Sequence, residues 1–173
     1  SLCQISVVEN DSAIHAAYVS VNMQLDAVGI RNIPYDIPIE LINLIELTEK
    51  FGSLSHGKLK GFTYRTHDHT SKLSFTIFML FGLPRIEFEA ALAHELMHVW
   101  LYRNSSNLPI EKSEGLCNLG SALIYNNDGT YFSKIHLHAM ENDPHTIYGD
   151  GYRHMKTKLK KWGWNGLINH ITE

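Results

Sequence analysis

The sequence has 173 residues, of which 44% are apolar and 19% are charged, a length and composition that fit one domain over residues 1–173 with a sizeable core. Its formal net charge of −3 gives no electrostatic basis for nucleic-acid binding, and its longest apolar run is too short to span a membrane. Two cysteines exclude a disulfide framework and a four-cysteine zinc module, and their scarcity, with no recognisable leader, favours the cytoplasm.

The first half of the chain predicts one long helix and a few short strands. Strands are indicated by segments rich in Phe, Thr, Tyr and Ile between polar or Gly-containing segments. The first helix is expected to take Asp11 or Ser12 as its N-cap. The predicted elements are a helix over 11–31, a strand over 37–42, a helical turn over 44–50, a loop over 52–57, and strands over 60–66 and 72–81.

The second half predicts helices. Pro84 suits the first position of a helix, and Glu87 and Glu89 suit its positive N-terminal end. The apolar stretch from Ala90 to Leu101 contains no Gly or Pro, so this helix should be long and mostly buried. The segments that follow are predicted as helices over 109–125, 131–142, 151–162 and 166–171, with a turn over 126–129, a loop over 144–150 and a break over 163–165. A small sheet followed by a helical half predicts an α+β fold.

The segment with the strongest chemical signal is residues 94–98, which read His-Glu-Leu-Met-His. On a helix, His94 and His98 lie about one turn apart, so both imidazoles can bind one zinc ion. Glu95 projects beside them and can accept a proton from the water that the metal activates. The alternative is a core helix without a metal, but burying two histidines and a glutamate together would be costly.

A catalytic zinc site needs a third protein ligand. Residues 99–104 do not supply the third histidine of the HExxHxxGxxH class, so a glutamate from the following helix is expected. We favour Glu114 over Glu111, because Glu111 lies near the helix start and can act as a capping residue. Asn118, one turn beyond Glu114, could orient a ligand, or could be a plain polar residue of the helix surface.

A peptidase also needs a donor for the oxyanion of the tetrahedral intermediate. The segment from His145 to His154 carries Tyr and His donors between glycines, and Tyr148 is our first candidate and His145 our second. A structural turn with surface aromatic residues is the alternative.

Other histidines give weaker signals. His67 and His69 could form a second metal site, but a solvated connection between strands is the simpler explanation. His136 and His138 would point in nearly opposite directions on a helix and so cannot share a metal. We assign no role to His56.

Three stretches together resemble the peptidase region of the DA1 proteins, plant regulators of organ size with bacterial relatives. They are FGLPRIEFEAALAHELMHVWLYRN, SEGLCNLGSALIY and IYGDGYRHMKTKLKKWGWNGLINHI. The family pattern consists of a GLPR turn, an AHExMHAW helix, an EEGxCQ helix and a YGDGFR segment. The similarity is clearest over 78–170, and its order and spacing agree with the family.

The resemblance implies a zinc metallopeptidase of the gluzincin type, in which a zincin-like helical half follows a small N-terminal sheet. Carried over by position, His94 and His98 are zinc ligands, Glu95 is the catalytic base and Glu114 is the third ligand. The implied partner is a protein or peptide substrate, with neither nucleic acid nor a membrane involved.

The sequence also departs from the family pattern. Ser113 and Asn118 replace the usual Glu and Gln. Plant members carry ubiquitin-interacting segments and a LIM zinc module before the peptidase, and these 173 residues contain neither, so we expect a stand-alone peptidase domain. Ubiquitin is then a partner by family analogy only.

The leading hypothesis is therefore a zinc-dependent endopeptidase. The alternative from another class is a catalytically silent zinc-binding module with a regulatory or protein-interaction role. A third hypothesis is a self-processing or autoinhibited peptidase, because the sequence begins at Ser1.

Overall fold

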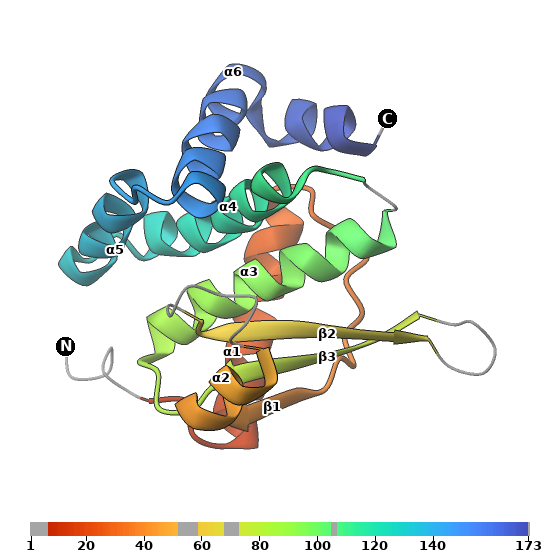
Figure 1. Cartoon of the computed structure of the whole chain (residues 1–173), viewed down its shortest axis with the longest axis vertical. Helices are drawn as coiled ribbons and strands as arrows, with labels where there is room; N and C mark the ends of the chain where they lie inside the picture. Colours follow the sequence, from red (N-terminus) through yellow and green to blue (C-terminus); the bar gives the residue numbers. More distant parts are fainter. Residues whose placement is uncertain (1–6, 52–58, 68–72, 105–106, 173) are drawn as a thin grey trace.

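The structure is a computed structural model that describes residues 7–51, 59–67, 73–104 and 107–172. The predicted loop over 52–57, with His56, and the pair Asp68 and His69 lie outside the described residues. A small sheet occupies one side of the molecule and a helical layer the other, so the predicted α+β fold is confirmed (Figure 1). The elements in order are α1 Asp11–Ala27, β1 Ile39–Ile42, α2 Leu44–Phe51, β2 Gly61–His67, β3 Leu73–Leu80, α3 Arg85–Arg103, α4 Ile110–Asp128, α5 Tyr131–Glu141, the π-helix η3 Thr146–Asp150 and α6 Gly151–Thr172.

The sheet has three strands in the order β1-β3-β2. β1 runs parallel to β3, with Ile39 opposite Ile77, and β2 runs antiparallel to β3, with Phe62 opposite Phe78. β3 is the central strand and is largely buried, which agrees with its content of Phe, Ile, Leu and Met. β2 therefore forms one edge of the sheet, and α3 packs against it.

Helix α3 lies between the sheet and the helical layer, and α1 also packs against α3 (Figure 1). Eleven of its side chains are buried, which explains why its sequence is apolar over most of its circumference. Its buried carboxylates have polar partners: Glu89 accepts from Arg85 at 2.8 Å, and Glu95 accepts from Thr63 at 2.7 Å. Burial of α3 places residues 94–98 in the interior of the molecule.

Helix α4 returns antiparallel to α3, as three contacts in reversed order along the two helices show. Glu114 approaches His98 at one end, Asn118 approaches His94 in the middle, and the Ser121 hydroxyl donates to the Ala90 carbonyl at 2.8 Å. The described residues of the two helices therefore run in opposite directions, which brings Glu114 and Asn118 of α4 to the two histidines of α3.

Helix α6 crosses α4 at a pair of glycines. A Cβ atom built on Gly115 would lie 2.2 Å from the carbonyl oxygen of Gly151, so only glycine allows this approach. The contact holds the start of α6, and η3 before it, against the part of α4 that carries Glu114. Among the described residues, no helix has the length and apolar character needed to cross a membrane.

Helix ends differ from the prediction in several places. The N-cap of α1 is Asn10, whose side chain accepts from the Ala13 N–H at 3.0 Å, and neither Asp11 nor Ser12. This helix stops at Ala27, because Gly29 adopts a φ of 94°. Pro84 precedes its helix as the N-cap residue, and Pro109 does the same for α4.

In the last third of the chain, one predicted feature is wrong in part and another is confirmed. The predicted loop over 144–150 is wrong in its second part, because Thr146–Asp150 forms a π-helix. The predicted break near residue 163 is confirmed, since Gly163 has a φ of 65° and a ψ of 178° inside α6.

Candidate metal centre

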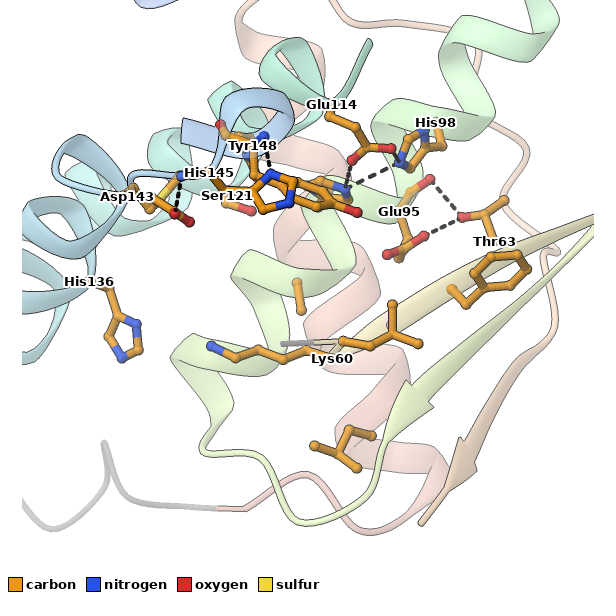
Figure 2. A pocket seen from close by; sticks show the side chains of 18 of the residues that line it. Lys60, Thr63, Glu95, His98, Glu114, Ser121, His136, Asp143, His145 and Tyr148 are labelled. Carbon is orange, nitrogen blue, oxygen red and sulfur yellow. Dashed lines mark hydrogen bonds and ion pairs between the residues drawn. The ribbon is translucent and has the colours of Figure 1, made fainter. Parts of the chain in front are cut away.

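Three side chains from two helices bring their ligand atoms together in the interior. The Nε2 atoms of His94 and His98 are 3.2 Å apart. The two carboxylate oxygens of Glu114 lie 3.2 Å from His94 Nε2 and 3.5 Å from His98 Nε2. Figure 2 shows Glu114 and His98 facing each other across this point. Each of the three side chains is only 14–16% exposed.

These separations match those of a tetrahedral zinc site. Two ligands bound to one zinc ion at about 2.0–2.1 Å and at the tetrahedral angle lie about 3.3–3.4 Å apart. All three separations are within about 0.2 Å of that value. The donor set of two imidazoles and one carboxylate is also a set that zinc binds, so the described residues fit this ion.

Asn118 fixes which nitrogen of His94 faces the cluster. Its Oδ1 atom lies 3.0 Å from His94 Nδ1, and because an amide oxygen only accepts, Nδ1 must carry the proton. Nε2 of a neutral His94 is then left with a lone pair directed at His98 and Glu114. The Asn118 amide donates to the Tyr148 carbonyl at 3.3 Å, which holds the side chain in place.

The cluster favours a positive charge at its centre. Burial lowers the pKa of His94, but the hydrogen bond and negative charge of Glu114 outweigh burial, and the pKa is raised. Burial raises the pKa of Glu114, but hydrogen bonds and charge from His94 and His98 outweigh it, and the pKa lies well below its ordinary value. Both shifts arise because a cation between these groups is stabilised, and a metal ion can take the place of the proton.

A buried thiol adjoins the cluster. The Sγ atom of Cys117 and the ring nitrogens of His94 and His98 all lie within 4.8 Å of one another. Burial raises the pKa of the Cys117 thiol well above its ordinary value, and the charges of Glu114 and Glu95 raise it further. Without a metal ion the thiol is therefore protonated, and binding of zinc through sulfur would require the loss of this proton.

Glu95 is turned away from its own helix towards the sheet. Its carboxylate Oε2 accepts from the Thr63 hydroxyl at 2.7 Å, and its backbone carbonyl lies 3.1 Å from the same hydroxyl. Both residues are buried, and Figure 2 shows Thr63 reaching from its strand towards Glu95. Sequence reasoning missed Thr63, because nothing in the sequence indicates that this strand residue pairs with Glu95.

A cavity of about 1200 Å³ adjoins the cluster, and His94, His98 and Glu114 all contribute to its lining. Tyr148 and His145 both line it, with ring centroids 5.0 Å apart, and Figure 2 shows them on the helical side. Burial raises the pKa of Tyr148, as do the charges of Glu114 and Glu95, so its phenol stays protonated and can donate. His145 Nδ1 accepts from the backbone N–H groups of Ile147 and Tyr148, so a neutral His145 carries its proton on Nε2.

Among the described residues, the group of side chains close enough to hold a metal ion includes no histidine besides His94 and His98. His136 lines the cavity and stacks on Tyr125, with centroids 4.9 Å apart. His138 adjoins Asn142, the C-cap residue of its helix. His67 ends β2, and the second-site hypothesis for His67 and His69 is untested because His69 lies outside the described residues.

Fold and site together define a class: an α+β protein in which two histidines of one buried helix meet a carboxylate from the next helix, beside a buried glutamate. A family model described as "DA1-like: Protein DA1" matches residues 40–130, more than half of the chain and the span that contains this cluster. The chain belongs to the DA1-like family, and the resemblance found in the sequence is confirmed.

Individual relatives cover the chain to different extents. It is 30% identical to the LIM domain-containing protein HDR3 of Oryza sativa subsp. japonica, over 55% of this chain and 26% of that protein. It is 25% identical to Protein DA1 of Arabidopsis thaliana, over 76% of this chain and 30% of that protein. Protein DA1-related 1 of Arabidopsis thaliana is 30% identical, over 55% of this chain and 23% of that protein.

The chain thus spans less than a third of the length of these relatives. No solved structure matches it significantly.

Proposed function

We propose that this protein is a zinc metallopeptidase that hydrolyses peptide bonds in protein or peptide substrates. The observation that carries the proposal is the convergence of two imidazole nitrogens and the Glu114 carboxylate at separations of 3.2–3.5 Å. In the proposal His94, His98 and Glu114 hold the zinc, and Asn118 orients His94. Family membership supports the proposal, because the match includes the segment that carries these residues.

Zinc, when bound, supplies a Lewis acid that polarises a carbonyl group and makes water more nucleophilic at neutral pH. Glu95 follows His94 directly in the sequence and lines the same cavity, and its carboxylate takes the proton of the attacking water in this proposal. The same carboxylate then passes the proton to the leaving amine. The negative charge of Glu95 acts on His94, which supports their proximity.

With a volume of about 1200 Å³, the cavity is large enough to receive a segment of a peptide. Apolar residues line one part of it and polar residues adjoin the cluster; the apolar part includes Leu44, Phe62, Leu80 and Ile110. A cavity with a mainly apolar lining and a few convergent polar groups is typical of ligand sites. This supports an enzymatic role over a closed structural metal site, which would need no adjoining cavity.

Tyr148→Phe should lower kcat by about 10²–10³-fold with little change in KM, because removing one oxyanion donor has an effect of that size. The substitution removes only the hydroxyl, whereas His145 also caps η3 through its ring. Steady-state kinetics on one peptide measures the effect. An unchanged kcat would exclude Tyr148 as the donor to the oxyanion. His145 would then be the remaining candidate, and His145→Gln would test it.

The alternative function is a catalytically silent zinc-binding module with a regulatory role. One relative is named for a LIM domain, and this name is the observation that favours the alternative. The buried Glu95 beside the cluster argues against the silent module, since a purely structural zinc site does not need a general base.

The test is a metal analysis of the purified chain combined with hydrolysis of a broad peptide library. We expect one zinc ion per chain, cleavage of library peptides, loss of cleavage with a chelator and recovery on adding zinc. One zinc ion per chain with no cleavage of any peptide would favour the silent module instead.

A further inference from the structure

The carboxylate of Glu95 is held by the sheet. Thr63 lies in β2, 32 positions before Glu95, and its hydroxyl donates to Glu95 Oε2 at 2.7 Å. The side chains are nearly inaccessible, since Thr63 is 8% exposed and Glu95 is 6% exposed. A hydroxyl carries one proton, and the longer 3.1 Å contact to the Glu95 carbonyl leaves the carboxylate as the favoured acceptor.

The same face of β2 has a gap where Glu95 lies. Gly61 precedes Thr63 by two positions, so both residues face the same side of the sheet. A Cβ atom on Gly61 would lie 2.9 Å from Glu95 Cγ and 2.9 Å from the sulfur of Met79, and 3.2 Å from Glu95 Oε1. The missing side chain of Gly61 thus leaves room for the methylene groups of Glu95.

We propose that Thr63 is a positioning residue for the catalytic base, and that Gly61 provides the space in which Thr63 holds it. This inference rests on the proposed function. A glutamate side chain has three rotatable bonds, so an unrestrained carboxylate would spend much of its time away from the reacting water. The Thr63 bond engages Oε2 and fixes the rotamer, which assigns the proton transfer to Oε1.

The matched pair Thr63→Val and Thr63→Ser tests this assignment. Valine has the shape of threonine without the hydroxyl, whereas serine keeps the hydroxyl. Thr63→Val should lower kcat by about 10–100-fold, the effect expected for a lost hydrogen bond to a charged group. Its KM should stay within about two-fold, because a positioning role affects the transition state. Thr63→Ser should recover most of the loss, and both variants should keep one zinc ion per chain.

A second measurement does not need activity. In the metal-free protein, Thr63→Val should lower the urea midpoint of unfolding, because Glu95 loses its buried donor. The same substitution in a Glu95→Ala background should lower it much less, since the acceptor is then already gone. Equal losses in the two backgrounds would overturn the proposed contact.

Gly61→Ala provides an independent variant that keeps the Thr63 hydroxyl and displaces the Glu95 methylene groups instead. We expect a lower kcat with zinc retained. Wild-type kcat in folded Thr63→Val, or equal loss in Thr63→Ser and Thr63→Val, would overturn the inference and leave the proposed function standing. The wild-type chain is measured before any variant. If it binds zinc and cleaves no peptide, the proposed function is overturned, and this outcome is distinct from a failure of the inference about Thr63.

Discussion

Glu95→Gln should lose peptide hydrolysis and keep its zinc. The amide has nearly the size of the carboxylate and can still accept from the Thr63 hydroxyl, so the buried contact between strand and helix should survive. It cannot take a proton from water, however, and loss of a general base lowers kcat by about 10²–10⁴-fold. We expect the full loss in kcat at an unchanged zinc content.

The matched control is Glu111→Gln, which makes the same chemical change at an exposed glutamate of α4. This variant should keep both zinc and the wild-type kcat. Metal analysis, circular dichroism and steady-state kinetics on one peptide measure the three properties. A folded Glu95→Gln protein that cleaves peptides at the wild-type rate would remove Glu95 from the role of base.

The local part of the site could be predicted from the sequence, because it depends on helical spacing. His94 and His98 are four residues apart in an apolar stretch without Gly or Pro, and Glu114 and Asn118 have the same spacing on the next helix. Once each segment is helical, geometry places each pair on one face. The antiparallel return of α4 then brings the two faces together.

The contribution of the sheet could not be predicted. Thr63 and Gly61 reach Glu95 because β2 forms the edge strand next to β3, and that strand order depends on pairing between distant segments. The strand was predicted over 60–66, and it forms over Gly61–His67. Nothing in a single sequence states which face of such a strand meets α3, so neither residue could be singled out.

Errors at the ends of elements have local causes. The first helix was predicted to continue to Arg31, but it ends at Ala27, because the chain turns at Gly29, which has a φ of 94°. The segment 144–150 was predicted as a loop because of its Pro and Gly residues. His145 accepts from the N–H groups of Ile147 and Tyr148, and this side-chain cap starts the short π-helix.

Glu114→Gln should lower the zinc affinity by about 10²-fold or more, since a tetrahedral site loses one of three protein ligands. The carboxylate lies 14% exposed between both imidazoles, so the substitution also removes the negative charge that balances the ion. Zinc content after dialysis and competition with a chromophoric chelator measure the effect. Glu111→Gln, one turn earlier on the same helix, is again the matched control and should bind zinc normally.

Cys117→Ala decides between the two ligand candidates that α4 offers. The Cys117 sulfur lies within 4.8 Å of the imidazole nitrogens, against 3.2 Å and 3.5 Å for the Glu114 oxygens, and its raised pKa disfavours the thiolate that zinc would bind. We therefore expect Cys117→Ala to keep its zinc affinity within about three-fold, well short of the effect of losing a ligand.

The cobalt-substituted protein gives a direct view of the same choice. A cobalt ion bound by nitrogen and oxygen alone shows no intense thiolate charge-transfer absorption, whereas bonding to sulfur produces one. We expect the wild-type spectrum to lack this absorption and to be unchanged in Cys117→Ala. A strong thiolate band that Cys117→Ala abolishes, together with normal zinc binding by Glu114→Gln, would make Cys117 the third ligand, and the two histidines would then hold the metal with sulfur in place of the carboxylate.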